Sequence, residues 1–219
     1  MPDLLDLYSC QGGATRGYQQ AGFTVHGVDI DDQPRYIGDA FTQADVIRFL
    51  ADNMAWIRET FAFVHASPPC QRYSRAQKIQ QREHPDLIAP TRELLDETGL
   101  PWVIENVEEA RSELKDPVML CGAPFGMKTY RHRLFETSGW TLTPPPHPQH
   151  TAPLTKMGRP RKPGEMAHYV GNFSGVQEAR DDMQMPWASR DGLRECIPPA
   201  YARYVAEQWL AQHATATAA

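Results

Sequence analysis

Apolar segments of strand length alternate with helix-length segments over the first two-thirds of this 219-residue chain. The segments with strand character are residues 3–8, 23–30, 40–44, 61–66 and 102–105. Helical segments fall between them, at residues 14–21, 46–60 and 90–98. Parallel strands need crossover connections of about this length, and the crossover helices then cover the sheet. The order therefore predicts the α/β class, with a mostly parallel central sheet and helices on both faces.

The last third of the chain is irregular until its end. Residues 133–136 are a further candidate strand, whereas residues 138–163, which include Pro144-Pro145-Pro146, show no sustained periodicity. Residues 200–213 place apolar side chains on one side of a helix. We expect four parts: an α/β core at 1–137, a small Pro-rich irregular insertion at 138–195, a helix returning to the core at 196–213 and a frayed tail at 214–219.

The chain resembles neither a membrane protein nor a secreted one. Its apolar runs are far shorter than the roughly 18 to 20 residues that span a bilayer. Its first residues lack the basic and apolar regions of a signal peptide. We therefore expect a cytoplasmic protein without membrane contact, and a monomer.

Positive charge is concentrated in one part of a chain whose net charge is −5. Residues 126–163 contain seven Lys and Arg but a single acidic residue, Glu136. This asymmetry predicts one basic face that attracts nucleic acid, with a solvated linker of incidental charge as the alternative.

The spacing of cysteine and histidine predicts no metal site. No CxxC pair or dense disulfide pattern occurs among the four cysteines, so they are expected to be reduced: Cys10, Cys70, Cys121 and Cys196. The histidines of the second half show no zinc-site spacing with a nearby cysteine: His132, His147, His150 and His168.

A glycine turn follows the first strand and precedes the first helix. A strand ending near an acid, then a glycine turn and a helix, is how doubly wound folds bind nucleotide-like ligands. The turn Ser9-Cys10-Gln11-Gly12-Gly13 does not match GxGxxG, which disfavours a dinucleotide dehydrogenase. Asp29 ends the second strand, where a carboxylate can accept hydrogen bonds from a ribose; a helix cap or loop acid is the alternative.

Two prolines precede Cys70 directly after the apolar strand at 61–66. They restrict the backbone and present the sulfur in a fixed direction, as a nucleophile requires. Basic residues follow at once and favour a thiolate: Arg72, Arg75, Lys78 and Arg82. An inert buried cysteine is the alternative.

Two further groups complete a candidate catalytic set. Glu105 ends the next strand, and because neighbouring parallel strands end at one edge, its carboxyl is expected near Cys70. Desolvation there would raise its pKa and let it hold a proton at neutral pH. Alternation along a strand puts Arg131 and Arg133 on one face, as donors to an oxygen or phosphate. A solvated acid and two surface arginines are the alternatives.

Five motifs in chain order resemble those of the cytosine-C5 DNA methyltransferases, which use S-adenosylmethionine. The motifs are Asp6-Leu-Tyr-Ser-Cys-Gln-Gly-Gly, Ser67-Pro-Pro-Cys-Gln, Glu105-Asn-Val, Arg131-His-Arg and Ile197-Pro-Pro. The match spans about residues 4–212, and the short chain is most like the compact methylases of bacteriophages. It implies a Rossmann-like methyltransferase fold and an enzyme of bacterial or phage-infected cells, with restriction protection and phage DNA modification among the compatible roles.

The resemblance implies a covalent mechanism. Cys70 would attack C6 of cytosine and Glu105 would protonate or hydrogen-bond N3. Arg133, aided by Arg131, would contact O2, and Asn106 belongs to the same set. C5 would take the methyl group, leaving S-adenosylhomocysteine, before a base removes the C5 proton and the cysteine leaves. In double-stranded DNA the target cytosine must flip out, so residues 71–83 are expected to close over it.

The resemblance also implies binding residues. Tyr8 would pack on the adenine, Gly12 and Gly13 would border the methionine part, and Asp45, or alternatively Asp39, would face the adenine amine. The full cofactor set is Asp6, Tyr8, Gly12, Gly13, Asp29, Ile30, Asp45, Val46 and Pro69. The substrate set is Gln71, Arg72, Ser74, Arg75, Lys78, Arg159, Arg161 and Lys162.

The chain departs from the family pattern at four places. Cys10 replaces the first glycine of the cofactor turn, Thr129 replaces a glutamine, and Arg194-Glu195 replaces a Gly-Asn pair. The region between Phe135 and Ile197 is much shorter than the usual target-recognition domain. RNA or a free cytosine nucleotide is therefore an alternative substrate, and a catalytically silent binder of DNA or cofactor is an alternative function.

Overall fold

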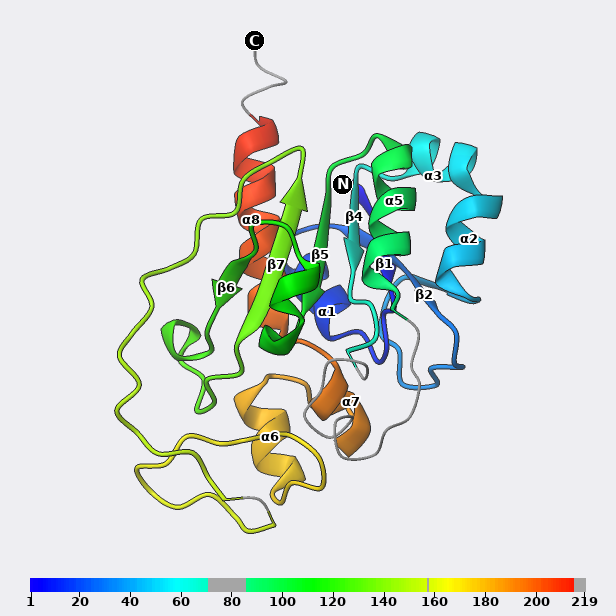
Figure 1. The fold of residues 1–219 in the computed structure, drawn as a ribbon. Coiled ribbons are helices and arrows are strands. Elements are labelled where there is room, and N and C mark those ends of the chain that lie inside the picture. Colours follow the sequence, from blue (N-terminus) through cyan, green and yellow to red (C-terminus); the bar gives the residue numbers. More distant parts are fainter. Residues whose placement is uncertain (71–85, 157, 215–219) are drawn as a thin grey trace.

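The computed structural model describes residues 1–70, 86–156 and 158–214. Within them, seven strands form one sheet in the order β3-β2-β1-β4-β5-β7-β6 (Figure 1). The strands are β1 (Asp3–Leu7), β2 (Thr24–Asp29), β3 (Ala40–Gln43), β4 (Phe63–Ala66), β5 (Trp102–Asn106), β6 (Val118–Leu120) and β7 (Arg133–Ser138). The pairs from β3 to β5 are parallel, and β7 runs antiparallel to both of its neighbours. The mostly parallel sheet and the strand at 133–136 are confirmed.

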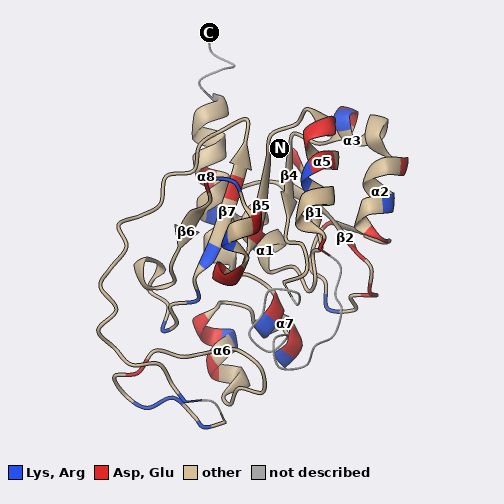
Figure 2. Ribbon diagram, viewed as in Figure 1, with Lys and Arg blue, Asp and Glu red and all other residues tan. Residues whose placement is uncertain are grey.

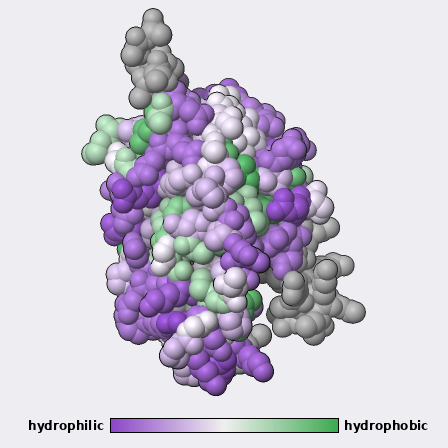
Figure 3. Space-filling view, turned by 90° about the vertical axis from the view of Figure 1, so that its left-hand side faces the viewer, coloured by the Kyte–Doolittle hydropathy of each residue, from purple (hydrophilic) through white to green (hydrophobic). Residues whose placement is uncertain are grey.

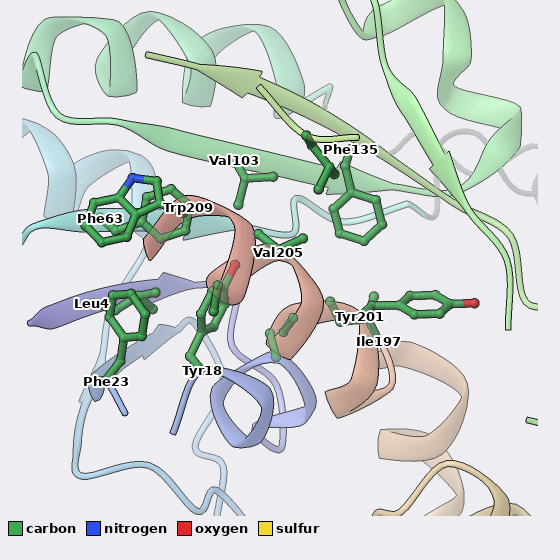
Figure 4. Packing of buried hydrophobic residues seen from close by; sticks show 14 of the residues in the cluster. Leu4, Tyr18, Phe23, Phe63, Val103, Phe135, Ile197, Tyr201, Val205 and Trp209 are labelled. Atoms are coloured by element: carbon green, nitrogen blue, oxygen red, sulfur yellow. The ribbon is translucent and has the colours of Figure 1, made fainter. Parts of the chain in front are cut away.

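Helices cover both faces of the sheet, as predicted. On one face lie α1 (Gly13–Gln20) and α8 (Pro199–Ala214), and on the other lie α2 (Val46–Asp52), α3 (Met54–Thr60) and α5 (Ile88–Thr98). An apolar core fills the space between the sheet and the helices on each face. Figure 4 shows the core on the side of α1 and α8, where Trp209 of α8 packs on Phe63 of β4 with ring centroids 5.1 Å apart. None of the helices in the described ranges has the length and apolar character needed to cross a membrane.

The predicted helix at 46–60 is two helices, because Asn53 interrupts it. Asn53 has non-helical backbone angles, φ −119° and ψ 16°, and its side-chain amide donates to the Phe49 carbonyl at 2.8 Å. Asparagine competes for backbone hydrogen bonds in this way and so favours helix ends. Asp45 caps α2 by accepting from the Arg48 backbone N–H at 2.9 Å.

The insertion at 138–195 is more ordered than its sequence suggests. It contains α6 (Val176–Asp182) and α7 (Arg190–Glu195), which periodicity did not predict. A third apolar cluster, which includes Tyr169, Met183 and Leu193, packs these helices together. Both helices lie beside the edge at which the parallel strands end (Figure 1). The sequence also did not predict β6 or the short 3-10 helices η1 (Glu108–Glu113) and η2 (Ala123–Phe125).

Candidate active site

The expected catalytic residues follow or end adjacent strands. Cys70 follows β4 by four residues, and β4 pairs with β5, which ends in Glu105 and Asn106. Strand β7 is antiparallel, so it begins at the edge where β5 ends, and Glu105 is paired with Phe135. Arg133, two residues before Phe135, is thereby brought to the same edge. The sheet topology thus assembles Cys70, Glu105 and Arg133.

Glu105 and Arg133 form a buried and incompletely bonded pair. Arg133 Nε lies 3.0 Å from Glu105 Oε1, and the two side chains are only 13% and 6% exposed. Despite that distance, Oε1 makes no hydrogen bond of good geometry within the described residues. Burial raises the pKa of Glu105, and the charge of Arg133 and a hydrogen bond from Ser67 oppose the shift. The carboxyl is therefore biased toward holding a proton and has an unused oxygen.

The Cys70 thiol lies close enough to Glu105 and Arg133 for their charges to change its pKa. Burial raises the pKa of Cys70, the charges of Arg133 and Arg131 lower it, and Glu105 raises it. Asn106 holds the loop in place, because its side-chain amide donates to the Pro68 carbonyl at 2.9 Å. The geometry makes Asn106 a positioning residue for the Pro-Pro-Cys turn.

The structure gives Arg131 a different role from the one predicted for it beside Arg133. It precedes β7 with a left-handed backbone, φ 35°, so the strand alternation that would align the two arginines does not reach it. Its Nη2 donates to the carbonyls of Arg194 at 3.0 Å and Cys196 at 2.6 Å, and the residue is buried. Burial and the nearby Arg133 charge lower the pKa of Arg131 to about 9. Its guanidinium ties β7 to the C-terminal segment, which leaves Arg133 as the arginine beside Glu105.

A buried chain of polar groups supports Glu105 from behind. Tyr18 Oη lies 2.8 Å from His65 Nδ1, and His65 Nε2 lies 2.9 Å from Ser67 Oγ. Ser67 in turn interacts with the Glu105 carboxyl and lowers its pKa. His65 is fully buried, and burial lowers its pKa to about 3, so the ring is neutral. The sequence analysis did not predict this row of hydrogen-bonded groups. The available signal was His65, which interrupts the apolar run at 61–66.

The glycine turn adopts the path that a glycine at Cys10 would favour. Tyr8 and Cys10 have left-handed backbones, with φ 59° and 46°, and Gly12 has φ 85°. A side chain at such an angle costs roughly 1–2 kcal/mol, so Cys10 keeps the conformation at a small penalty. Asp6, at the base of the turn, accepts from Thr15 Oγ1 at 2.5 Å, and burial raises its pKa to about 7. Asp6 supports the turn from within the core.

The end of β2 offers polar and apolar groups suited to a nucleoside. The Asp29 carboxylate accepts from the backbone N–H groups of Cys10 at 2.8 Å and Asp31 at 3.0 Å, and each oxygen has a second lone pair. Ile30 is 62% exposed, unusual for a large apolar side chain beside a polar turn. Ser9 Oγ is buried without a hydrogen-bond partner in the described structure. These groups fit a bound ribose and base.

The structure separates the two acids proposed for the adenine amine. Asp45 follows the end of β3, where the Ala44 N–H donates to the Asp29 carbonyl at 2.8 Å. Asp39 precedes β3, at the opposite edge of the sheet, and accepts from the Val25 N–H at 2.9 Å. This hydrogen bond and a second one from the Gln19 side chain lower the pKa of Asp39. The geometry therefore favours Asp45.

The other cofactor residues differ in what they offer. Tyr8 is half-buried, with its hydroxyl 2.8 Å from Thr91 Oγ1, and Pro69 is half-buried. Val46 is 2% exposed within the core, so its backbone is the part available to a ligand. Gly13 is required by packing, because an added Cβ would overlap the Ile197 carbonyl.

Two arginines of the basic segment, Arg159 and Arg161, form ion pairs within the protein, and the nucleic-acid contact expected of this segment stays a prediction. Arg159 pairs with Glu165, with Nη1 2.8 Å from Oε2, and Arg161 Nε pairs with Glu178 at 2.6 Å. Figure 2 shows this basic loop and the acidic residues of α6. The charge asymmetry in the sequence did not anticipate these partners, because both acids lie beyond residue 163. Lys162 is exposed.

The expected cover and most of the substrate set lie outside the described residues. The cover is residues 71–83, which include Gln71, Arg72, Ser74, Arg75 and Lys78.

Comparison with known proteins identifies the fold. No protein-family model matches the chain, and no curated protein matches its sequence. The S. pombe Dnmt2 methyltransferase structure has a TM-score of 0.62 at 13% identity, over 97% of this chain and 99% of that one. A DNA modification methyltransferase of an E. coli prophage aligns at 23% identity and TM-score 0.45, over 62% and 45% of the two chains. A Spodoptera frugiperda DNMT2 mutant aligns at 16% identity and TM-score 0.47, over 80% and 57%. The chain has the methyltransferase fold of the S. pombe protein and spans about half the length of the other two.

Proposed function

We propose that this chain is a DNA cytosine-C5 methyltransferase that uses S-adenosylmethionine. The observation that supports it best is the meeting of Cys70, Glu105 and Arg133 at one sheet edge, in the field of one another. The fold shared with the S. pombe Dnmt2 methyltransferase supports methyl transfer in general. A silent binder has no need of a nucleophile held beside a carboxyl biased toward protonation.

The cofactor would be held at the ends of β2 and β3. Asp29 would accept the ribose hydroxyls, Ile30 would pack on the adenine, and Asp45 would face the adenine amine. Ser9 supplies a buried hydroxyl that a ligand would satisfy. When bound, this cofactor supplies an electrophilic methyl group on a sulfonium.

The catalytic residues would activate C5 of a flipped cytosine. Cys70 Sγ forms a bond to C6, and the displaced electron pair is stabilised by Glu105 at N3 and Arg133 at O2. The C5 carbon would become nucleophilic and would take the methyl group as the methyl–sulfur bond breaks, with S-adenosylhomocysteine as the product. A base would then remove the C5 proton, and elimination of the Cys70 thiolate would restore the C5–C6 double bond. Burial raises the pKa of the Cys70 thiol, and the charges of Arg133 and Arg131 partly offset that rise, which helps to form the thiolate needed for attack on C6.

RNA or a free cytosine nucleotide is the second candidate substrate. The pairing of Arg159 with Glu165 and of Arg161 with Glu178 removes two of the cations expected to contact duplex phosphates. Phosphate neutralisation dominates duplex affinity, so this loss favours a smaller or more flexible substrate.

Incubation with radiolabelled S-adenosylmethionine and duplex DNA, RNA or dCMP separates these substrates. We expect label in the DNA, none of it with the C70S variant, and unchanged cofactor affinity of C70S by calorimetry. Label entering only dCMP or only RNA would overturn the DNA assignment, and turnover by C70S would exclude the covalent route.

Duplex DNA containing 5-fluorocytosine tests the covalent bond directly. Fluorine does not leave C5 as a proton does, so the enzyme should remain attached, with the added mass on the peptide that carries Cys70. Cys10, Cys121 and Cys196 serve as internal controls and should remain unmodified. An intact-mass spectrum without adduct under turnover conditions would contradict the mechanism.

A further inference from the structure

Four soft ligand atoms from three separate segments meet beside the start of β7. Cys121 follows β6, His132 precedes β7, and His147 and His150 belong to the Pro-rich segment after β7. Their sulfur and imidazole nitrogen atoms all lie within 4.8 Å of one another. The sequence predicted no metal site because no cysteine and histidine have zinc-site spacing along the chain. The fold instead brings together residues as far apart as Cys121 and His150, which are separated by 29 positions. His168, the fourth histidine considered for that spacing, is not part of this group.

Two of the distances between these atoms are close to the edges of a tetrahedral zinc site. Cys121 Sγ lies 3.4 Å from His150 Nε2, and His132 Nε2 lies 3.2 Å from His147 Nε2. With bonds of about 2.0–2.1 Å to nitrogen and about 2.3 Å to sulfur, tetrahedral zinc holds neighbouring donors about 3.3–3.6 Å apart. A set of one thiolate and three imidazoles also favours zinc over the cations that prefer oxygen ligands.

A carboxylate orients one of the imidazoles. Glu108 Oε2 lies 3.1 Å from His132 Nδ1, which leaves His132 Nε2 to face the other donors. A ligating histidine typically gives its second nitrogen to a carboxylate in this way. Glu108 begins η1, three residues after Glu105, so the support comes from the same strand end as the proposed active site.

The surroundings hold the remaining donors in place. The His150 ring stacks on Tyr130 with centroids 3.5 Å apart and an interplanar angle of 9°. Prolines flank His147 on both sides, at positions 146 and 148, which restricts the backbone before any ligand binds. Cys121 is buried, whereas His147 is exposed, so an ion could enter from the solvent side.

We infer that Cys121, His132, His147 and His150 bind one zinc ion in a closed structural site. Four protein ligands leave no open position, which is the arrangement of structural rather than catalytic zinc. Binding displaces the thiol proton of Cys121 and leaves the imidazoles neutral. The ion would fasten the long Pro-rich segment, which runs along the left-hand side of Figure 1, to the start of β7. Figure 3 faces that side of the molecule and shows hydrophilic surface with hydrophobic patches between. The ion would thereby hold the strand that presents Arg133.

The metal content of the purified protein tests this inference independently of methyl transfer. After dialysis against zinc and removal of the free ion, mass spectrometry should find about one zinc per chain. The C121S and H150A variants should lose most of it, and H168A, which changes an exposed histidine outside the group, should retain it. A wild-type protein that emerges metal-free, or a C121S variant with full zinc content, would overturn the inference.

Cobalt substitution of the wild-type protein gives a second test, whose main readout does not depend on a variant. Co(II) in this site should produce a thiolate-to-cobalt charge-transfer absorption and the visible bands of tetrahedral Co(II), displaced by equimolar zinc. The E108Q variant should keep the spectrum and bind zinc about 10–100-fold more weakly, as is typical when an outer carboxylate is lost. The absence of a charge-transfer band in wild-type protein would exclude Cys121 as a ligand.

Discussion

Strand β7 contributes to two buried Arg–Glu pairs that differ in how well they are satisfied. Glu136 is bonded through both oxygens to Arg92, at 2.6 and 2.7 Å, and also accepts from the Lys115 N–H at 2.9 Å. Glu105 lies 3.0 Å from Arg133, but the facing oxygen makes no well-formed hydrogen bond in the described structure. Exposure does not distinguish them, since both carboxylates are at most 6% exposed.

The difference separates a pair that is fully bonded within the fold from a pair that keeps one oxygen for the substrate proposed above. A fully bonded buried carboxylate fixes the elements around it, here α5 and β7. An unused buried oxygen costs about 1–3 kcal/mol, which the fold tolerates most readily where function requires it. The raised pKa of Glu105 has the same origin, because burial is not fully offset by its partners.

Removing the charge of Glu136 should have the largest effect on stability. The E136Q variant leaves Arg92 buried without its partner, and breaking a buried pair in this way costs about 3–5 kcal/mol. We expect that loss in the free energy of urea unfolding, with turnover per folded molecule unchanged. The control is E207Q, which breaks the exposed pair with Arg203 on α8 and should cost less than about 1 kcal/mol. Equal losses in both variants would contradict the structural role of Glu136.

The matched change in the other pair should affect turnover instead. The E105Q variant keeps the shape of the side chain but has no acidic proton for N3. We expect kcat to fall about 10²–10³-fold, the usual cost of losing one transition-state donor. Its unfolding free energy should fall much less than that of E136Q. Parallel losses of stability and turnover would instead make Glu105 a structural residue.

Removing Ser67 should produce the smallest change, visible in the pH profile. The Ser67 hydrogen bond favours the charged form of Glu105 and lowers its pKa, so the S67A variant should raise that pKa further. Because the proposed role needs a protonated Glu105, the alkaline limb of kcat against pH should move to higher pH. The exposed serine variant S112A should leave the profile in place. A shift to lower pH would contradict the proposed protonation state.

Local sequence patterns predicted most of the fold and the candidate nucleophile for a clear reason. Strand and helix periodicities record which face of each segment is buried, so the order of strands and helices as far as β5 could be inferred without contacts. The prolines before Cys70 act on adjacent backbone and could also be recognised locally. The break at Asn53 could not be inferred in this way, because a continuous helix over residues 46–60 would show a similar apolar pattern. The break depends on the hydrogen bond from the Asn53 side chain to Phe49.

The tertiary structure decided which polar groups meet. Arg161 finds Glu178 17 positions away, Tyr18 finds His65 47 positions away, and Cys121 finds His150 29 positions away. None of these contacts has a periodic signature, since each depends on how loops close and on which strands become neighbours. The sequence by itself therefore determined the sheet, its helical layers and the residue types at the strand ends. Only the folded chain determined which charges were neutralised, which carboxylate was left unsatisfied and which thiol and imidazoles came together.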